Sequence, residues 1–359
     1  MSTPSTLFLT HHNVATTVTT IGVDVLMREL IEELSAAFSA FSKAEFDVPI
    51  RTGFYYDKPH SGLIEWMPLH RREQSVFIKT VGYHPSNPVA RHLPTVISTF
   101  NLFDPSTGQL VAVTDGILLT ALRTGAASAV ATRLLTDLSK PITLGLIGSG
   151  AQAVSQLHAI LQVTDIAEIR IFDTNPEVSS SFAGRTELFN HSKVRVRMCS
   201  LADVAEHSDV LCTATSIAVG EGPLFDKLTL KNDVHINAVG SDLPGKIELP
   251  ISLLRKSFVC PDFPEQAMLE GECQQLSRDE VGVSIMEVAA RPDMYSRMKN
   301  RETVFDSTGW ALEDYIATQL LMRYADDLGL GSRIHLAGNI NDPWNPYADL
   351  AVVAAAGAN

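Results

Sequence analysis

The chain has 359 residues, 45% of them hydrophobic, so it is long enough to bury the cores of two domains. Its formal net charge of −13 argues against a nucleic acid or an anionic membrane as partner, because both bind positive surfaces. The sequence contains no run near the roughly 18 apolar residues of a membrane helix, and residues 7–9 are too short for a signal peptide. These features predict a cytoplasmic protein.

The cysteines show no spacing typical of a metal site. No two stand in a C-x-x-C pair, and none has a histidine at zinc-finger spacing. We therefore expect no structural metal and reduced, mostly buried thiols at all four positions: Cys199, Cys212, Cys260 and Cys273.

The first third of the chain is predicted to be a helix followed by strands. Apolar residues recur at helical spacing over residues 23–42. The turn-forming residues 104–108 then lead into a strand at 109–113, as expected for a β-hairpin. A helix followed by clustered strands predicts an α+β arrangement. The remaining predicted strands are residues 50–56, 62–67, 75–82 and 93–103.

Three cations stand out in this region: Arg51, Lys79 and Arg123. Lys79 interrupts an apolar strand, and a buried charge costs several kcal/mol unless it is paired. Each cation alone fits a structural ion pair, whereas the three together, in an acidic protein, fit a site for a small carboxylate. Glu65 has apolar neighbours, so it is either a surface strand residue or an acid with a raised pKa that transfers protons.

From residue 120 onward, helices alternate with short apolar strands, which predicts a parallel sheet covered by helices. The predicted helices are residues 122–135, 151–161 and 310–328. The predicted strands are residues 142–147, 168–173, 209–213 and 235–239 and one that begins at residue 304.

The turn between residues 147 and 151 indicates a dinucleotide site. Gly148 allows a tight turn, Gly150 lets the backbone approach a pyrophosphate, and the helix from Ala151 directs free N–H groups at the phosphates. Asp173 follows the next strand, where such folds place the carboxylate that binds the ribose hydroxyls. A carboxylate there repels a 2′-phosphate, so the sequence favours NAD over NADP.

Ligands of open α/β sheets bind beyond the carboxyl ends of the strands, so the turn at residues 240–246 borders the predicted cofactor site. Asp242 in this turn is a candidate catalytic carboxylate. An aspartate before Pro-Gly is equally typical of a turn or a helix cap.

Several long motifs resemble the ornithine cyclodeaminase/mu-crystallin family, and within it the bacterial lysine cyclodeaminases. The resemblance extends to about residue 330. It is carried by residues 65–68, 79–83, 118–128, 148–153, 237–240, 271–275 and 304–309.

The resemblance implies a role for each matching residue. Asp242 matches the catalytic acid/base and Glu65 a second carboxylate. The chain departs from the ornithine enzymes at two positions. It has Thr308 where those enzymes usually have valine, and it has Trp66 within the Glu-x-Met-Pro motif. The implied substrate-binding residues are Arg51, Lys79, Arg123 and Thr308. The implied cofactor-binding residues are Thr95, Arg123, Gly148, Gly150, Ala151, Gln152, Asp173, Ala214, Ala238, Val239, Gly240, Ser241, Lys246 and Ser307.

The resemblance also implies an activity and an architecture. The expected reaction converts L-lysine to L-pipecolate and ammonia with recycled NAD. The alternatives are conversion of L-ornithine to L-proline, an imine reductase or amino-acid dehydrogenase, and a non-enzymatic NAD(P)-binding protein. We expect a homodimer, a Rossmann-type NAD domain at residues 122–309, and an α+β substrate-binding and dimerisation domain formed by residues 1–121 and 310–359.

Overall fold

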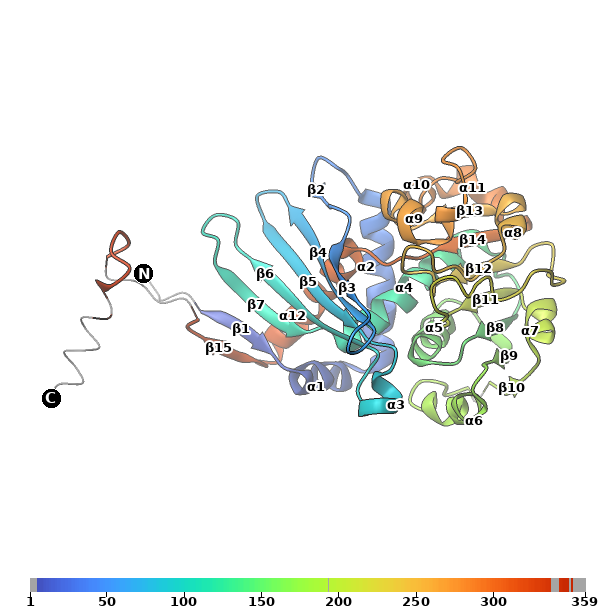
Figure 1. The fold of residues 1–359 in the computed structure, drawn as a ribbon, viewed down its shortest axis with the longest axis horizontal. Coiled ribbons are helices and arrows are strands. Elements are labelled where there is room, and N and C mark those ends of the chain that lie inside the picture. The colour runs from blue at the N-terminus through green and yellow to red at the C-terminus, as the bar shows by residue number, and fades with distance from the viewer. Residues whose placement is uncertain (1–4, 193, 337–341, 349, 351–359) are drawn as a thin grey trace.

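The computed structural model describes residues 5–192, 194–336, 342–348 and 350. Residues 6–334 contain two β-sheets and the helices that pack on them (Figure 1). This confirms the predicted α/β class. The first sheet has eight strands in the order β15-β1-β7-β6-β5-β4-β2, with β3 also paired to β4. Its strands are β1 (Thr6–Leu9), β2 (Phe46–Asp47), β3 (Thr52–Tyr56), β4 (Gly62–Arg71), β5 (Ser75–Tyr83), β6 (Val96–Phe103), β7 (Leu110–Asp115) and β15 (Ser332–Ile334).

One face of this sheet is covered and the other is more exposed. Side chains in β4 and β5 alternate between buried and less buried positions, as expected for strands that pack one face on a core. Glu65 on β4 and Lys79 on β5 are on the covered face, where Met67 pairs with Lys79 across the two strands. The strand pattern therefore turns two charged side chains toward the interior.

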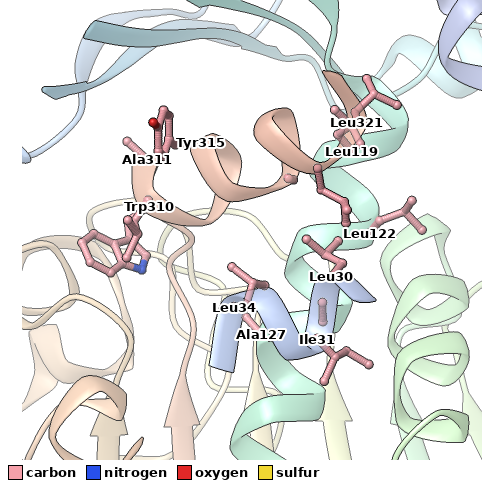
Figure 2. Packing of buried hydrophobic residues seen from close by; sticks show 14 of the residues in the cluster. Leu30, Ile31, Leu34, Leu119, Leu122, Ala127, Trp310, Ala311, Tyr315 and Leu321 are labelled. Atoms are coloured by element: carbon pink, nitrogen blue, oxygen red, sulfur yellow. The ribbon is translucent and has the colours of Figure 1, made fainter. Parts of the chain in front are cut away.

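Helices α1 (His11–Ile21), α2 (Val23–Ala40) and α12 (Ala311–Asp327) belong to this half of the molecule. Figure 2 shows α2, α4 (Ile117–Leu135) and α12 packing around one apolar cluster. The labelled members are Leu30, Ile31 and Leu34 from α2, Leu119, Leu122 and Ala127 from α4, and Trp310, Ala311, Tyr315 and Leu321 from the start and body of α12.

Helix α4 is shared between the two halves. It packs on α2 and α12 and also on α5 (Ala151–Leu161), which follows the glycine turn. Small residues permit this close approach, since a Cβ at Gly125 would lie 2.4 Å from the carbonyl oxygen of Ser155 on α5. The Ala-rich helix therefore lies between the two halves and contacts β6 of the first sheet and β12 and β14 of the second.

The second sheet has seven parallel strands in the order β10-β9-β8-β11-β12-β14-β13. These are β8 (Ile142–Ile147), β9 (Ile166–Phe172), β10 (Val196–Met198), β11 (Val210–Thr213), β12 (His235–Ala238), β13 (Phe258–Pro261) and β14 (Thr303–Asp306). The other helices are α3 (Asn87–Arg91), α6 (Pro176–Arg185), α7 (Leu201–His207), α8 (Ile251–Lys256), α9 (Pro264–Glu270), η1 (Glu272–Gln275), α10 (Ile285–Ala290), α11 (Pro292–Tyr295) and η2 (Ser296–Asn300).

Most predicted elements are confirmed, and four differences stand out. The helix predicted from residue 122 begins at Ile117, and the strand predicted from residue 93 begins at Val96 because α3 precedes it. Helix α1 was not predicted; a capping box between Thr10 and Asn13 starts it. Strand β15 was also missed because its pairing with β1 is distant in sequence.

The predicted domain division remains a proposal. The first sheet uses strands from residues 6–115 and 332–334, and the second uses strands from residues 142–306. Helix α4 crosses the proposed boundary at residue 121. Residues 1–4, 193, 337–341, 349 and 351–359 lie outside the described residues.

Candidate active site

The glycine turn after β8 has the backbone form that a dinucleotide site needs. Gly148 has φ 86°, and a Cβ there would lie 2.6 Å from the carbonyl oxygen of Ala214, so only glycine fits without strain. Gly150 is the N-cap residue of α5 and makes no side-chain cap hydrogen bond. A Cβ atom added at Gly150 would have no atom beyond its chain neighbours within 4 Å. Its open surroundings and the first N–H groups of α5, at Ala151 and Gln152, suit a phosphate.

Asp173 follows β9 and binds this turn. Its Oδ2 accepts hydrogen bonds from the Ser149 backbone N–H (2.7 Å) and hydroxyl (3.1 Å), while Oδ1 accepts from the backbone N–H of Asn175 (2.8 Å). Arg185 on α6 donates to the Ser149 carbonyl oxygen at 2.6 Å. The carboxylate thus lies at the expected place, and its contact with a ribose stays a prediction.

The remaining predicted cofactor residues mostly follow the carboxyl ends of neighbouring strands. Ser307, after β14, has a buried hydroxyl with no hydrogen-bond partner in the described part of the chain, so it is free to contact a ligand. Thr95 lies apart in sequence, between α3 and β6 of the first sheet. The others are Ala214 after β11 and Ala238, Val239, Gly240 and Ser241 at and after β12.

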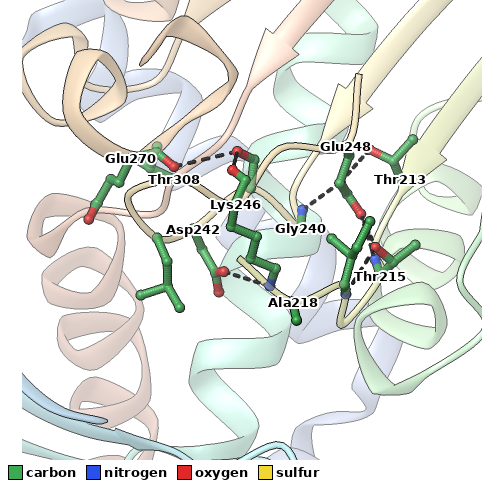
Figure 3. Close-up of polar contacts among 12 residues, drawn as sticks. Thr213, Thr215, Ala218, Gly240, Asp242, Lys246, Glu248, Glu270 and Thr308 are labelled. Carbon is green, nitrogen blue, oxygen red and sulfur yellow. Dashed lines mark hydrogen bonds and ion pairs between the residues drawn. The ribbon is translucent and has the colours of Figure 1, made fainter. Parts of the chain in front are cut away.

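Asp242 and Lys246 form an ion pair in the turn after β12 (Figure 3). Lys246 Nζ lies 2.8 Å from Asp242 Oδ1 and 5.4 Å from the centre of the Tyr83 ring. The lysine side chain is buried, which opposes its charge, but the Asp242 carboxylate raises the pKa of Lys246. Asp242 keeps 35% of its side chain exposed, so its carboxylate is accessible from one side.

Arg51 connects the first sheet to the turns of the second. Its guanidinium donates hydrogen bonds to the carbonyl oxygens of Asp242 and, at 3.2 Å, of Thr308. Its Nε lies 2.7 Å from Glu270 Oε1 and 3.6 Å from Glu65 Oε2. The structure therefore brings together four of the predicted site residues and one that was not predicted.

Glu270, at the end of α9, is that unpredicted residue. Burial raises the pKa of Glu270 to about 7; Arg51 opposes the rise, and the carboxylates of Glu65 and Asp242 add to it. Glu65 accepts a hydrogen bond from the Tyr55 hydroxyl at 2.7 Å. In the sequence Glu270 directly precedes the motif at residues 271–275, but no local pattern shows that α9 meets Arg51.

Lys79 and Arg123 are paired with carboxylates from α12, as one interpretation of the sequence expects. Asp314 Oδ1 accepts from Lys79 Nζ and Arg123 Nε, both at 3.0 Å, and Glu313 Oε2 accepts from Arg123 Nη1 at 2.7 Å. Burial lowers the pKa of Lys79 to about 8, although Asp314 opposes this. Burial also raises the pKa of Glu313 to about 8, against the effect of Arg123. A contact of either cation with a substrate carboxylate stays a prediction.

Hydrogen bonds to Asp262 fix Thr308 and Gly309, and Gly309 lies against the Arg123 side chain. Asp262 accepts hydrogen bonds from the Thr308 hydroxyl (3.0 Å) and the Gly309 backbone N–H (2.6 Å). Gln266 donates to the same hydroxyl at 2.9 Å. A Cβ at Gly309 would lie 2.2 Å from Arg123 Nη1, so the guanidinium fills the space that a side chain would need.

Within the part of the chain that the structure describes, no group of three or more His, Cys, Asp or Glu side chains is placed to hold a metal ion. No helix there is long and apolar enough to cross a bilayer. All four cysteines are free, and three of them are buried.

Comparison with known proteins identifies the family of this chain. Residues 11–327 match the model of the ornithine cyclodeaminase/mu-crystallin family. The chain is 41% identical to an L-lysine cyclodeaminase from Streptomyces rapamycinicus over 91% of this chain and 95% of that protein. It is 30% identical to an ornithine cyclodeaminase from Brucella suis over 92% of this chain and 89% of that protein.

Two solved structures are also similar. One is a lysine cyclodeaminase studied for its recognition of L-lysine, L-ornithine and L-2,4-diaminobutyric acid, with a TM-score of 0.92 and 43% identity over 96% of this chain and 99% of that one. The other is an archaeal alanine dehydrogenase dimer with bound NAD, with a TM-score of 0.79 and 28% identity over 93% and 100% of the two chains. The chain therefore belongs to the ornithine cyclodeaminase/mu-crystallin family.

Proposed function

We propose that the protein is a lysine cyclodeaminase that converts L-lysine to L-pipecolate and ammonia with NAD as a recycled cofactor. The observation that carries the proposal is the convergence of Arg51, Glu65, Glu270 and Asp242 beside the turns of a dinucleotide fold. Lysine is preferred to ornithine because identity to the Streptomyces lysine cyclodeaminase is 41%, against 30% for the Brucella ornithine enzyme.

The chain's residues fit NAD. The N–H groups at the start of α5 would hold the pyrophosphate, Asp173 the ribose hydroxyls, and the free hydroxyl of Ser307 lies on the same edge of the sheet. When bound, NAD supplies a reversible hydride acceptor, which removes a hydride from the substrate Cα and later returns it.

The three cations would bind the substrate carboxylate through charge-assisted hydrogen bonds, which fix the orientation of Cα. Each cation also lies beside one of the protein's own carboxylates, so a bound substrate carboxylate would share these cations with Glu270, Asp314 and Glu313. Glu65, Glu270 and Asp242 place three more acids nearby, which suits the two amino groups of a diamino acid.

Proton transfer falls to the acids of this cluster. Asp242, the most exposed of the three, would accept a proton from the side-chain amine so that this amine attacks the α-imine within the same molecule. Glu270, with a pKa of about 7, can hold or release a proton near neutral pH and would serve the departing ammonia together with Glu65.

We also propose that the protein is a homodimer and that it is located in the cytoplasm. Ile64, Ile97 and Val111 are exposed on the uncovered face of the first sheet, and Ile64 pairs with the exposed Phe54 of β3. A second copy is the proposed occupant of that face. Light scattering that gives a monomer mass would reject the dimer. Four free cysteines agree with a reducing compartment such as the cytoplasm, which cell fractionation would test.

An ammonia assay tests the proposed function. The purified protein with L-lysine and NAD should release ammonia while the absorbance of NADH stays constant, because the hydride is returned. A dehydrogenase would accumulate NADH and a reductase would consume it. A non-enzymatic binding protein would release no ammonia from lysine or ornithine, and faster release from ornithine would reject lysine as the preferred substrate.

A further inference from the structure

We propose that Glu248 is a positioning residue that fixes the turn carrying Asp242 against the turn that follows β11. This inference rests on the proposed cyclodeaminase function. The Glu248 side chain is 0% exposed. Figure 3 shows it between the Thr213 and Thr215 side chains and the backbone of Gly240.

The Glu248 carboxylate accepts four hydrogen bonds from two separate turns. Its Oε2 accepts from the Thr213 hydroxyl at 2.6 Å and from the backbone N–H of Gly240 at 3.0 Å. Its Oε1 accepts from the backbone N–H of Thr215 at 2.8 Å and from the Thr215 hydroxyl at 2.7 Å. One carboxylate therefore connects the carboxyl end of β11 with the carboxyl end of β12.

No lysine, arginine or histidine forms an ion pair with Glu248 among the described residues; the nearby Lys246 is paired with Asp242. Burying a carboxylate without a counter-ion is costly unless hydrogen-bond donors replace its water. The donors here come from the turns that hold the predicted cofactor residues Ala214 and Gly240. The buried Glu248 carboxylate therefore fixes the position of these two turns relative to each other.

Two further buried carboxylates hold Glu248 in turn. Glu272 accepts hydrogen bonds from the backbone N–H groups of Glu248 at 2.7 Å and Leu249 at 3.2 Å. Asp306 at the end of β14 accepts from the backbone N–H of Glu272 at 2.8 Å. A continuous chain of hydrogen bonds therefore runs from β14 through Glu272 and Glu248 to the turns after β11 and β12.

The arrangement requires a carboxylate at position 248. Each carboxylate oxygen accepts one backbone N–H, from Gly240 or from Thr215, and a backbone donor cannot be reversed. A glutamine would direct its NH₂ group at one of these donors in either orientation. A Cβ at Gly240 would also lie 2.2 Å from Glu248 Oε1, so the glycine and the carboxylate fit as a pair.

The test uses the full-length Glu248→Gln variant and measures NAD affinity by calorimetry without lysine, then ammonia release at saturating NAD. We expect weaker NAD binding and a loss in kcat/KM of about 10- to 100-fold, because a small displacement of the turns misplaces Asp242. Thr213→Val removes one hydroxyl donor but keeps both backbone bonds, so it should give a smaller loss on both measurements. This variant also tests the proposal if Glu248→Gln does not fold.

Asp209→Asn is the matched control. Asp209 also accepts a backbone N–H, from Thr143 at 2.7 Å, and binds Lys231 at 2.6 Å, but it lies at the amino ends of β8 and β11. It should lower the melting temperature while NAD affinity stays unchanged. Glu248→Gln or Thr213→Val with a lower melting temperature but wild-type NAD affinity and ammonia release would overturn the inference. A wild-type protein that binds NAD but releases no ammonia would reject the proposed function, and the NAD titration would still decide the role of Glu248.

Discussion

Arg51 shows how much of the site depends on single side chains. Its guanidinium contacts the carbonyl oxygens of Asp242 and Thr308, which follow strands of the second sheet. It also contacts the carboxylates of Glu65 and Glu270. Arg51 itself directly precedes β3 of the first sheet. Three approaching carboxylates raise the pKa of Arg51 despite its burial, so its positive charge is secure. Arg51 therefore stays charged, as the proposed contact with a substrate carboxylate requires.

Asp242→Asn should abolish ammonia release and leave NAD affinity nearly unchanged. The amide keeps the shape of the side chain but cannot accept a proton from the substrate amine. Calorimetry with NAD and an ammonia assay measure the two effects separately. Asp326→Asn, at an exposed position on α12, is the control that should change neither. Ammonia release by Asp242→Asn at the wild-type rate would remove Asp242 from the mechanism.

Glu270 should make the stability of the wild type depend on pH. Burial raises its pKa from an ordinary 4.5 to about 7, so between these values the folded state binds more protons than the unfolded state. The stabilisation is complete below pH 4.5 and is lost as the pH rises toward 7, by about 3 kcal/mol at most.

Glu270→Gln does not titrate, so it isolates this effect. Relative to the variant, the wild type should lose stability when urea unfolding is repeated at rising pH through this range. A constant difference in the free energy of unfolding between the two proteins across that range would show that Glu270 has an ordinary pKa.

Among single residues, the sequence predicted the cations better than their partners. Lys79 was recognised as a charge in an apolar strand that needs a partner, but Asp314 lies 235 positions away. Spacing within a strand or helix shows which residues share a face, and it does not show which elements meet. Glu270 was missed for the same reason, because only the fold brings α9 to Arg51 and Glu65.

At the scale of elements, the segments with strong periodicity were predicted with their bounds. Strand β8 and helix α5 occupy residues 142–147 and 151–161, because an apolar strand, a glycine turn and an amphipathic helix are all local signals. Strand β15 carries no such signal: its three residues are exposed and depend on pairing with β1. Tertiary contacts alone determine elements of this kind.

At the junction between β14 and α12, the methyl group added by Gly309→Ala should lower stability and weaken lysine binding. Gly309 has φ 72° and packs against the Arg123 guanidinium, whereas Gly329 has φ 64° and open space around it. Alanine at either position costs about 1 kcal/mol of backbone strain. Gly309→Ala should in addition displace Arg123 and raise the KM for lysine.

The matched pair Gly309→Ala and Gly329→Ala separates backbone strain from the effect on Arg123. Melting temperatures should fall in both variants, while the KM for lysine should rise only in Gly309→Ala. Equal KM values in the two variants would mean that Arg123 does not depend on Gly309.

At the scale of the molecule, the candidate site lies where two different sheets meet. The parallel sheet supplies the cofactor turns and Asp242, and the mainly antiparallel sheet supplies Glu65 and Lys79. The two kinds of sheet were predictable from the change in pattern near residue 120. Their relative placement was not, since it depends on small residues in α4 such as Gly125 and on the apolar cluster of Figure 2.

The proposed reaction determines where the hydrogen on Cα and the α-amino nitrogen of lysine end up. The hydride removed from Cα returns to the same carbon, and the nitrogen that leaves is the α-amino group, because the side-chain amine attacks the α-imine. L-lysine that carries deuterium at Cα and a heavy-nitrogen label at the α-amino group follows both atoms in one experiment.

With limiting NAD and excess labelled lysine, mass spectrometry should find the deuterium in L-pipecolate and the heavy nitrogen in ammonia, over many turnovers for each NAD. Loss of the deuterium to water, heavy nitrogen retained in the ring, or product limited to the amount of NAD would each contradict a cyclodeaminase that recycles its hydride.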